Sequence, residues 1–467
     1  MATSSAKSGG GRALLKHPRL VWYFAATELW DRISFQGMQA ILTLYLAEQL
    51  LLPGRAAHVV LLGPLRHAVE AITGPLNTEA LATQTFGIYL SLVFASPMLG
   101  GWLGDRFLSR RSAVIAGALA MTIGHVCLAF DASFLFGLLF LAVGTGLFRA
   151  NLSPQLVSLY PAGDRRLPEA FQIYNFAVTV GGTLAPIVIG ALATFYSWHV
   201  GFGAAGVGML IGLIIYLFAP HADLPPDIKP ARAERRPLTG EQRRAFFLLL
   251  ALWPALVSFW IAQSQIWNTY NLWVRDHVDL HLGTFTVPVP WMQSVDSGVN
   301  IIMTPLLLWW WATLDRRNRE PDLVTKLGIG CLLFAAGTTI LAFASPAPGS
   351  AAKVPLLFPV LFHFVSNIGW IWFAPTAAVL LISRAPRRMR GVMYGINYLS
   401  ISAATLISGR FGALYDHWSS RDFWLLHAAF PAAGGIAILA ASGFLTRNLP
   451  PIAEEDLPGP VVDLEPT

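Results

Sequence analysis

The feature that most constrains this chain is a series of apolar runs, each long enough to cross a lipid bilayer. A membrane-spanning helix needs about 20 consecutive, mostly apolar residues, and the sequence contains twelve such runs. They lie at 20–46, 84–104, 112–130, 133–152, 170–195, 200–218, 245–267, 288–311, 325–345, 354–383, 391–416 and 422–446. The pattern predicts an all-α membrane protein with twelve transmembrane helices.

Composition excludes several other classes. Of the 467 residues, 55% are hydrophobic and 12% are charged, where soluble proteins carry roughly 25% charged residues. A soluble enzyme could not bury so many apolar side chains without a large exposed patch. Cys127 and Cys331 lie inside apolar runs, and no phosphate-binding loop or nucleophile elbow is present. We therefore expect no enzyme, no ATP-driven pump, no catalytic or metal site, and no cofactor apart from a coupling proton.

The distribution of Lys and Arg predicts the orientation in the membrane. With a cytoplasmic N-terminus, 24 of the 32 basic residues fall in inside segments and five in outside loops. A cytoplasmic excess of basic residues orients multi-spanning proteins, so we expect both termini in the cytoplasm and a bacterial inner membrane location. The net charge of +6 then reflects topology rather than nucleic-acid binding. The N-terminus lacks the pattern of a cleaved signal peptide.

A polar linker divides the twelve runs into two sets of six. Residues 219–244 are rich in Pro, Arg and Glu, which indicates a flexible tether. Six plus six helices are typical of the major facilitator fold, with two six-helix bundles. The expected order is an N-terminal tail (1–19), a first bundle (20–218), the linker (219–244), a second bundle (245–446) and a disordered tail (447–467). The long outside segment 47–83 includes a stretch that predicts a short interfacial helix.

Charged residues within the first run point to proton transfer. Glu28, Asp31 and Arg32 are spaced i, i+3 and i+4, so they share one helical face, which Gln36 and Gln39 continue. Because ionised groups are costly inside a bilayer, they mark functional sites by default. Two carboxylates beside one guanidinium can bind and release a proton. The alternative is a salt-bridge cluster that only holds helices together.

Three further ionisable residues lie within predicted spans. Asp296 has no basic residue within one helical turn, so we interpret it as a proton carrier or as a cap for a kink near the preceding prolines. Arg149 follows two glycines and is interpreted equally as a site residue or as an arginine that reaches the inner interface. For Arg410, reaching the outer interface is the favoured interpretation.

Neutral polar residues within the spans complete the pattern. Four amides in the seventh run favour a wetted face, with one or two of them bonding helices together. They are Gln263, Gln265, Asn268 and Asn271. Three isolated histidines are interpreted as buried core residues rather than proton carriers. They are His125, His363 and His427.

Four local sequences together resemble the proton-dependent oligopeptide transporter family of the major facilitator superfamily. Residues 28–38 (ELWDRISFQGM) are similar to its first-span signature, 100–107 (GGWLGDRF) to its loop after the second span, 144–151 (GTGLFRAN) to its fourth-span motif, and 198–209 (WHVGFGAAGVGM) to the start of its sixth span. The resemblance extends from about residue 20 to residue 446. It implies twelve spans and a cavity between the halves that binds di- or tripeptides.

The resemblance also implies roles for individual residues. Glu28, Asp31 and Arg32 would couple transport to protons, Arg149 would receive a peptide carboxylate, and Asp105 with Arg106 would form an inner gate. From the resemblance and from the polar residues within the spans together, we predict a substrate-binding set of Arg32, Gln39, Arg149, Tyr174, Gln265, Asn268 and Trp370. Asp296, predicted from its own position within a span, joins the proton-coupling residues.

Several positions depart from the family pattern. Gln39 stands where relatives often have Arg, Ser264 where they commonly have Glu, and Trp370 where they have the Glu that receives the peptide amino terminus. Asp296 appears where relatives usually have Asn. The loss of the Glu at Trp370 removes the natural partner of a ligand ammonium group. Free dipeptides are then no longer the default substrate, and a blocked peptide, a peptide-like compound or an anionic metabolite would fit a site that keeps Arg32 and Arg149.

Three functional hypotheses follow. The leading one is a proton-coupled symporter that imports di- or tripeptides or a peptide-like solute through the bilayer by alternating access, with a short peptide or small molecule as its partner. We expect a monomer. The first alternative keeps the fold but makes the protein an exporter or a carrier of a non-peptide anion. The second alternative is a sensor that binds ligand without net transport.

Overall fold

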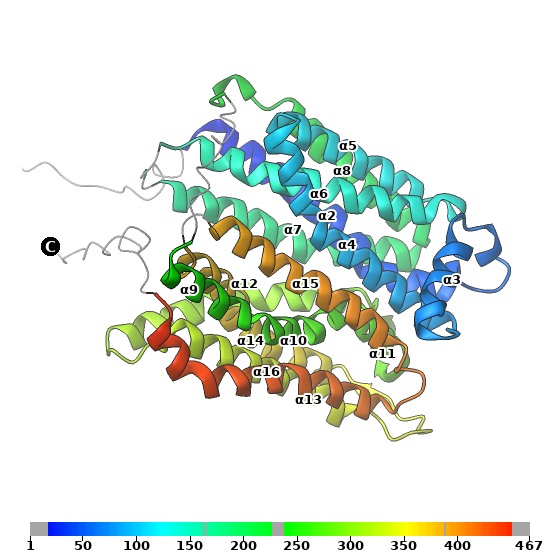
Figure 1. Ribbon diagram of the computed structural model, residues 1–467. Coiled ribbons are helices and arrows are strands. Elements are labelled where there is room, and N and C mark those ends of the chain that lie inside the picture. The colour runs from blue at the N-terminus through cyan, green and yellow to red at the C-terminus, as the bar shows by residue number, and fades with distance from the viewer. Residues whose placement is uncertain (1–16, 162–163, 165, 227–237, 387–388, 451–467) are drawn as a thin grey trace, which may run out of the picture. The chain divides into compact units, whose positions relative to one another are not determined.

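The computed structural model describes residues 17–161, 164, 166–226, 238–386 and 389–450. These residues are mostly helical (Figure 1). The helices before the predicted linker are α2 (Arg19–Tyr45), α3 (Leu62–Thr73), α4 (Thr78–Arg106), α5 (Arg110–Leu128), α6 (Phe134–Ser158), α7 (Leu167–Phe195) and α8 (Trp198–Leu217). Those after it are α9 (Gly240–Ala251), α10 (Trp253–Ser264), α11 (Thr269–His277), α12 (Trp291–Asp315), α13 (Leu323–Ala344), α14 (Leu357–Ser383), α15 (Arg390–Gly412) and α16 (Ser420–Asn448).

The predicted spans coincide with these helices, which confirms the all-α fold. In the described part of the chain, ten helices are long and apolar enough to cross a membrane. The other two predicted spans are α2 and α15, helices of 27 and 23 residues. α2 contains the charged residues Glu28, Asp31 and Arg32 in its interior, yet it is one continuous helix. The helix predicted within 47–83 is α3. The N-terminal tail, most of the C-terminal tail and 227–237 of the linker lie outside the described residues.

The chain forms two compact units, each described here by itself. Unit 1 comprises residues 1–41, 57–62 and 96–231, and unit 2 comprises residues 42–56, 63–95 and 232–467. The boundary therefore runs through α2 and α4, and the segments between 42 and 95 group mainly with the second half of the chain. The division into bundles at 219–244 stays a prediction.

In unit 1, small residues bring α6 close to two neighbours. Gly144 lies against Gly117 and Met121 of α5, so a Cβ at Gly144 would come within 2.7 Å of the Gly117 carbonyl oxygen. Gly146 lies against Ser96 of α4, where a Cβ would come within 2.6 Å of the Ser96 carbonyl oxygen. Small residues at such positions let helices pack closely in a membrane. This packing fixes the part of α6 that carries Arg149.

In unit 2, α13 packs against α14 and α16, and α10 packs against α15 and α16. Two short strand pairs occupy its loops. β1 (Val278–Asp279) pairs in parallel with β4 (Val354–Pro355), and β2 (His281–Leu282) pairs antiparallel with β3 (Phe285–Thr286). Gly283 provides the turn between β2 and β3 with a φ of 65°, a conformation that favours glycine. The sequence patterns did not predict these strands.

The seventh predicted span is interrupted where its amides concentrate. α10 ends at Ser264, a short 3-10 turn follows, and Asn268 has φ −117° and ψ −107°, after which α11 begins. The Gln265 side chain accepts a hydrogen bond from the Thr269 backbone N–H (3.4 Å). The Gln265 side chain thus provides a hydrogen-bond acceptor for a backbone N–H group that the break leaves without a helical partner. An irregular segment inside a membrane requires such a partner.

The close contact between α4 and α15 in unit 2 generates a test. A Cβ added at Gly87 would come within 2.7 Å of the Gly409 Cα. Gly87→Ala should therefore destabilise the protein by about 1–3 kcal/mol through overpacking, measured as a lower thermal melting temperature in detergent. Gly443→Ala is the control, because no atom lies within 4 Å of a Cβ there. Equal melting temperatures for the two variants would contradict the packing described.

Candidate functional site

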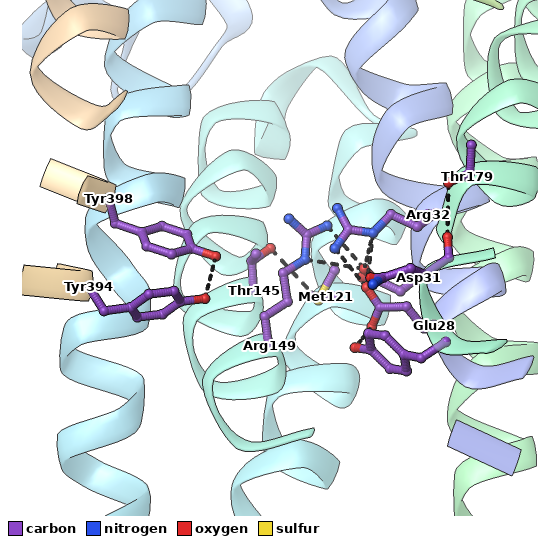
Figure 2. A network of polar contacts seen from close by, with 11 residues as sticks. Glu28, Asp31, Arg32, Met121, Thr145, Arg149, Thr179, Tyr394 and Tyr398 are labelled. Carbon is purple, nitrogen blue, oxygen red and sulfur yellow. Dashed lines mark hydrogen bonds and ion pairs between the residues drawn. The ribbon is translucent and has the colours of Figure 1, made fainter. Parts of the chain in front are cut away.

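The charged residues predicted on the first span form a buried ion-pair cluster in unit 1 (Figure 2). Arg32 donates from Nε and Nη2 to Glu28 Oε1, at 2.9 and 2.6 Å. Arg149 donates from Nε and Nη2 to Asp31 Oδ2, at 3.2 and 3.0 Å. Tyr174 donates its hydroxyl to Glu28 Oε2 at 2.6 Å. Residues from α2, α6 and α7 therefore meet in one network.

Exposure differs between the acids and the bases of this cluster. The side chains of Glu28 and Asp31 are 1% and 0% exposed, whereas those of Arg32 and Arg149 are 20% and 17% exposed. Within the described residues, no side chain accepts a hydrogen bond from Nη1 of either arginine. The cluster thus encloses its carboxylates and presents guanidinium groups that can bind an anion bidentately.

The two carboxylates are not equivalent. Both oxygens of Glu28 accept hydrogen bonds, from Arg32 and Tyr174. Asp31 uses only Oδ2, because its Oδ1 is enclosed and has no hydrogen-bond partner among the described residues. An enclosed polar atom without a partner is costly. Asp31 therefore offers a ready position for a proton, while Glu28 is fully stabilised as an anion.

Close helix packing places the cluster. A Cβ at Gly181 of α7 would come within 2.6 Å of the Leu29 carbonyl oxygen and 2.8 Å of the Arg32 Cβ, so the glycine lets α7 bring Tyr174 against α2. The Arg149 guanidinium lies 4.3 Å from the centre of the Phe35 ring, in cation–π contact. Arg149 therefore belongs to the cluster, and the interpretation that it reaches the inner interface was wrong.

A second buried polar network lies in unit 2. His363 Nδ1 of α14 lies 3.1 Å from Asp296 Oδ1 of α12, and Asn367 Nδ2 donates to the same oxygen at 2.8 Å. Tyr270 of α11 bonds through its hydroxyl to His363 Nε2 at 2.8 Å. His363 is buried, as expected, but it is not isolated, and Asp296, which has no basic residue within one turn of its own helix, has a basic partner on another helix. The partner is 67 residues away on another helix, beyond the reach of spacing arguments.

Three of the four amides of the seventh span are buried and bond to neighbouring helices. Gln265 donates to the Ser408 carbonyl oxygen and bonds to His427, both at 2.9 Å. Asn268 donates to the Thr83 carbonyl oxygen at 3.2 Å, and Asn271 accepts from Gln293 at 2.7 Å. These three are at most 1% exposed, whereas Gln263 is half-buried. More of the amides therefore join helices than the one or two expected, and the role of Gln265 and Asn268 in substrate binding stays a prediction.

The other predicted site residues are placed as follows. Gln39 is buried on α2, on the same helix as the charged cluster, and Trp370 is half-buried on α14. At the end of α4, Asp105 lies 3.7 Å from Arg110, and Arg106 lies over the Trp102 ring at 5.9 Å. The gate role of Asp105 and Arg106 stays a prediction.

One charged cluster in unit 2 was not anticipated from the sequence. Arg275 of α11 bonds to Glu79 Oε1 (2.6 Å), to Asp276 Oδ1 (2.6 Å) and to Glu48 Oε1 (3.5 Å). Burial raises the pKa of the Glu48 carboxyl, although Arg275 beside it acts in the opposite direction. These residues come from three separate segments, which the cluster fastens together.

Arg410 is exposed near the end of α15 and lines a cavity of about 650 Å³ with Asn77 and His417.

Known proteins are similar in sequence or fold to almost the whole chain. The sequence model described as Major Facilitator Superfamily matches residues 67–409. The peptide transporter YePEPT of Yersinia enterocolitica is 25% identical, with 96% of this chain and 97% of that protein covered. The uncharacterized transporter YclF of Bacillus subtilis is 27% identical, with 88% and 90% covered. A crystal structure of a peptide transporter in complex with sulfate has a TM-score of 0.81 at 24% identity, covers 93% and 96%, and shows the same fold.

The Asp31–Arg149 pair can be tested by a double-mutant cycle. Arg149→Met leaves Asp31 buried without its partner, which should cost about 3–5 kcal/mol of stability. Adding Asp31→Asn should recover part of this loss, because the unpaired charge is removed. The measurement is the apparent free energy of unfolding in detergent. Arg66→Met is the control, because the Arg66–Glu70 pair is exposed and should contribute at most about 1 kcal/mol. Additive effects of Arg149→Met and Asp31→Asn would refute the pairing.

Proposed function

We propose that this chain, which belongs to the Major Facilitator Superfamily and within it to the proton-dependent oligopeptide transporter family, is a proton-coupled symporter. It imports short peptides or a peptide-like solute by alternating access. The observation that carries the proposal is the cluster of unit 1, where two buried carboxylates pair with two partly accessible arginines. The proposal also rests on relatives that are named peptide transporters.

Asp31 is the proton acceptor in this proposal. Its Oδ1 is enclosed and has no partner among the described residues, so a proton can add there without displacing a hydrogen bond. Glu28 has three donors on its two oxygens, from Arg32 and Tyr174, which stabilise it as an anion. Protonation of Asp31 weakens its interaction with Arg149, since the ion pair becomes a hydrogen bond from a charged guanidinium to a neutral carboxyl group.

Charge balance explains how a proton and a carboxylate could move together. With Glu28 and Asp31 ionised, the two acids and two arginines sum to zero. Protonating Asp31 leaves a net positive charge on a buried cluster, which is costly in a low-dielectric surrounding. A substrate carboxylate bound to Arg149 and Arg32 restores neutrality. Loading both ligands or neither is therefore favoured over loading one, and this is the requirement for symport.

The same geometry suggests which end of the substrate is recognised. Arg32 and Arg149 suit a carboxylate, whereas Ser264 and Trp370 stand where the family has acidic residues that serve the opposite end. Ser264 donates to the Ile261 carbonyl oxygen of its own helix, and Trp370 offers a ring rather than a charge. We propose that a free carboxylate is required and a free amine is not. An N-blocked peptide or another peptide-like anion is then a substrate beside free peptides.

The cellular setting follows from the topology of the basic residues. The protein is a multi-pass membrane protein. We propose that it lies in the inner membrane with both termini in the cytoplasm, that it works as a monomer, and that the proton is its only coupling ion.

Proton coupling can be tested with the protein in liposomes. Asp31→Asn should abolish accumulation of a dipeptide driven by an imposed proton gradient, because the site can no longer change its proton occupancy. Exchange of labelled for unlabelled dipeptide should persist, since exchange needs no net proton movement. Glu241→Gln is the control, because Glu241 is exposed at the start of α9. Full accumulation in Asp31→Asn would rule this carboxylate out as the coupling site.

Substrate recognition can be tested with matched dipeptides. Amidation of the carboxyl end should weaken binding about tenfold or more, because a charge-assisted hydrogen bond contributes about 1.5–3 kcal/mol. Acetylation of the amino end should change binding much less. Binding is measured as thermal stabilisation and as competition for uptake. If amino acetylation is the more damaging change, a group other than Arg32 and Arg149 dominates recognition.

A further inference from the structure

We propose that Tyr270, His363 and Asp296 form a second proton-binding site in unit 2, which moves an additional proton with each substrate. The inference rests on the proposed symport function and adds to it, because it places proton binding on residues outside the cluster around Asp31. The ligand is a proton from water, so binding is a reversible acid–base step without any co-reactant.

The three side chains form a continuous hydrogen-bonded chain from α11 through α14 to α12. The Tyr270 hydroxyl bonds to His363 Nε2 at 2.8 Å, and His363 Nδ1 lies 3.1 Å from Asp296 Oδ1. Tyr270 and His363 are fully buried, and the Asp296 side chain is 12% exposed. Asp296 Oδ2 accepts no hydrogen bond from a described residue and is not among the enclosed atoms. The carboxylate is therefore held by one oxygen and accessible at the other.

The hydrogen-bonded side chains of Tyr270, His363 and Asp296 can bind one additional proton and release it again while the number of hydrogen bonds between them stays the same. In the unloaded state a neutral His363 donates from Nδ1 to Asp296, and Nε2 accepts from the Tyr270 hydroxyl. When a proton arrives through Asp296, it can settle on His363, which then donates from both nitrogens. The Tyr270 oxygen changes from donor to acceptor. The bond that forms is N–H on His363. The number of hydrogen bonds among the three side chains is unchanged, while the hydroxyl hydrogen of Tyr270 turns away from His363.

The electrostatic balance favours reversible loading. Without the additional proton, the three side chains carry the single negative charge of Asp296. With it, His363 and Asp296 form an ion pair with no net charge. A buried net charge is costly inside a membrane, which favours the loaded state when the site is closed. Water reaching the Asp296 carboxylate stabilises its negative charge and favours release. Access at Oδ2 thus controls the direction of proton movement.

Other titratable groups on the neighbouring helices make no hydrogen bond or ion pair with these three side chains, among the residues that the structure describes. His427 is buried and bonds to Gln265, the Cys331 thiol is buried in α13, and the exposed Tyr394 bonds to Tyr398 on α15. Lys326 in the first turns of α13 contacts Glu320, and the remaining charged residues of α12 to α16 lie near helix ends. Asn367, with Asn300 bonded to its amide oxygen at 2.7 Å, adds neutral hydrogen bonds. Tyr270, His363 and Asp296 are therefore the titratable groups that one network of hydrogen bonds connects here.

The location of Tyr270 connects this site to the Arg275 cluster. Both residues belong to α11, a helix of nine residues that begins after the break at Asn268. Tyr270 changes its hydrogen-bonding role when His363 is loaded, while Arg275 fastens the other end of the helix to Glu79. Binding of a proton near Asp296 can therefore change the hydrogen bond that holds one end of α11, while the contacts of Arg275 hold the other end.

The test uses Asp296→Asn and His363→Gln in the full-length protein in lipid. Infrared difference spectra between acidic and alkaline pH report protonation of an imidazole ring, and the change in the stretch of a carboxylate bonded to it, without requiring transport. The expected result is an imidazole signal that His363→Gln removes and Asp296→Asn shifts in pH. His125→Gln is the matched control, because His125 is also buried but bonds to Ser34 and to no carboxylate among the described residues. Tyr270→Phe, which keeps the His–Asp pair, should move the midpoint of the signal.

Transport stoichiometry provides the second measurement. The membrane potential that just stops dipeptide uptake gives the number of protons moved per substrate. Losing one coupled proton should lower the limiting accumulation about 50-fold at a potential of about 100 mV. The inference is overturned if Asp296→Asn and His363→Gln leave both the infrared signal and the stoichiometry unchanged. A wild type that shows the infrared signal but never accumulates substrate would instead refute the proposed symport and leave the proton site standing.

Discussion

The cost of an ionised side chain inside a membrane is the constraint on which this structure depends. Each buried carboxylate described above has a cationic or hydrogen-bonding partner on another helix: Asp31 pairs with Arg149, Glu28 accepts from Tyr174, and Asp296 pairs with His363. Because an unpaired charge would be costly, these partnerships decide which helix faces must meet. They also create groups that change charge when a proton or an anion binds.

Small residues and a broken helix make those partnerships possible. Gly181 allows α7 to approach Arg32, and Gly146 brings α6 against α4 before Arg149. The break at Asn268 produces the short helix α11, on which Tyr270 reaches His363. Backbone freed by such a break must be satisfied inside the protein, and Gln265 does so. Residues without charge therefore determine where the charges can act.

The sequence predicted local features well and long-range ones poorly. Apolar runs located the helices, and the i, i+3, i+4 spacing of Glu28, Asp31 and Arg32 located the first cluster, because both depend only on helical period. The pairing of Asp296 with His363 was missed because it joins helices far apart in sequence. A signal was available, since a buried carboxylate needs a partner and His363 is a buried base. Most amides of the seventh predicted span were expected to face water, because the helical period of polar residues is the same whether they face water or a neighbouring helix.

The central claim is that a proton and a carboxylate-bearing solute cross the membrane together through the Asp31–Arg149 cluster. The most direct measurement is the internal pH of liposomes that contain the wild-type protein and a trapped pH indicator, after a dipeptide is added outside without any imposed gradient. The account predicts acidification of the interior that begins with dipeptide uptake and follows its time course. Uptake of the dipeptide without acidification would contradict the account.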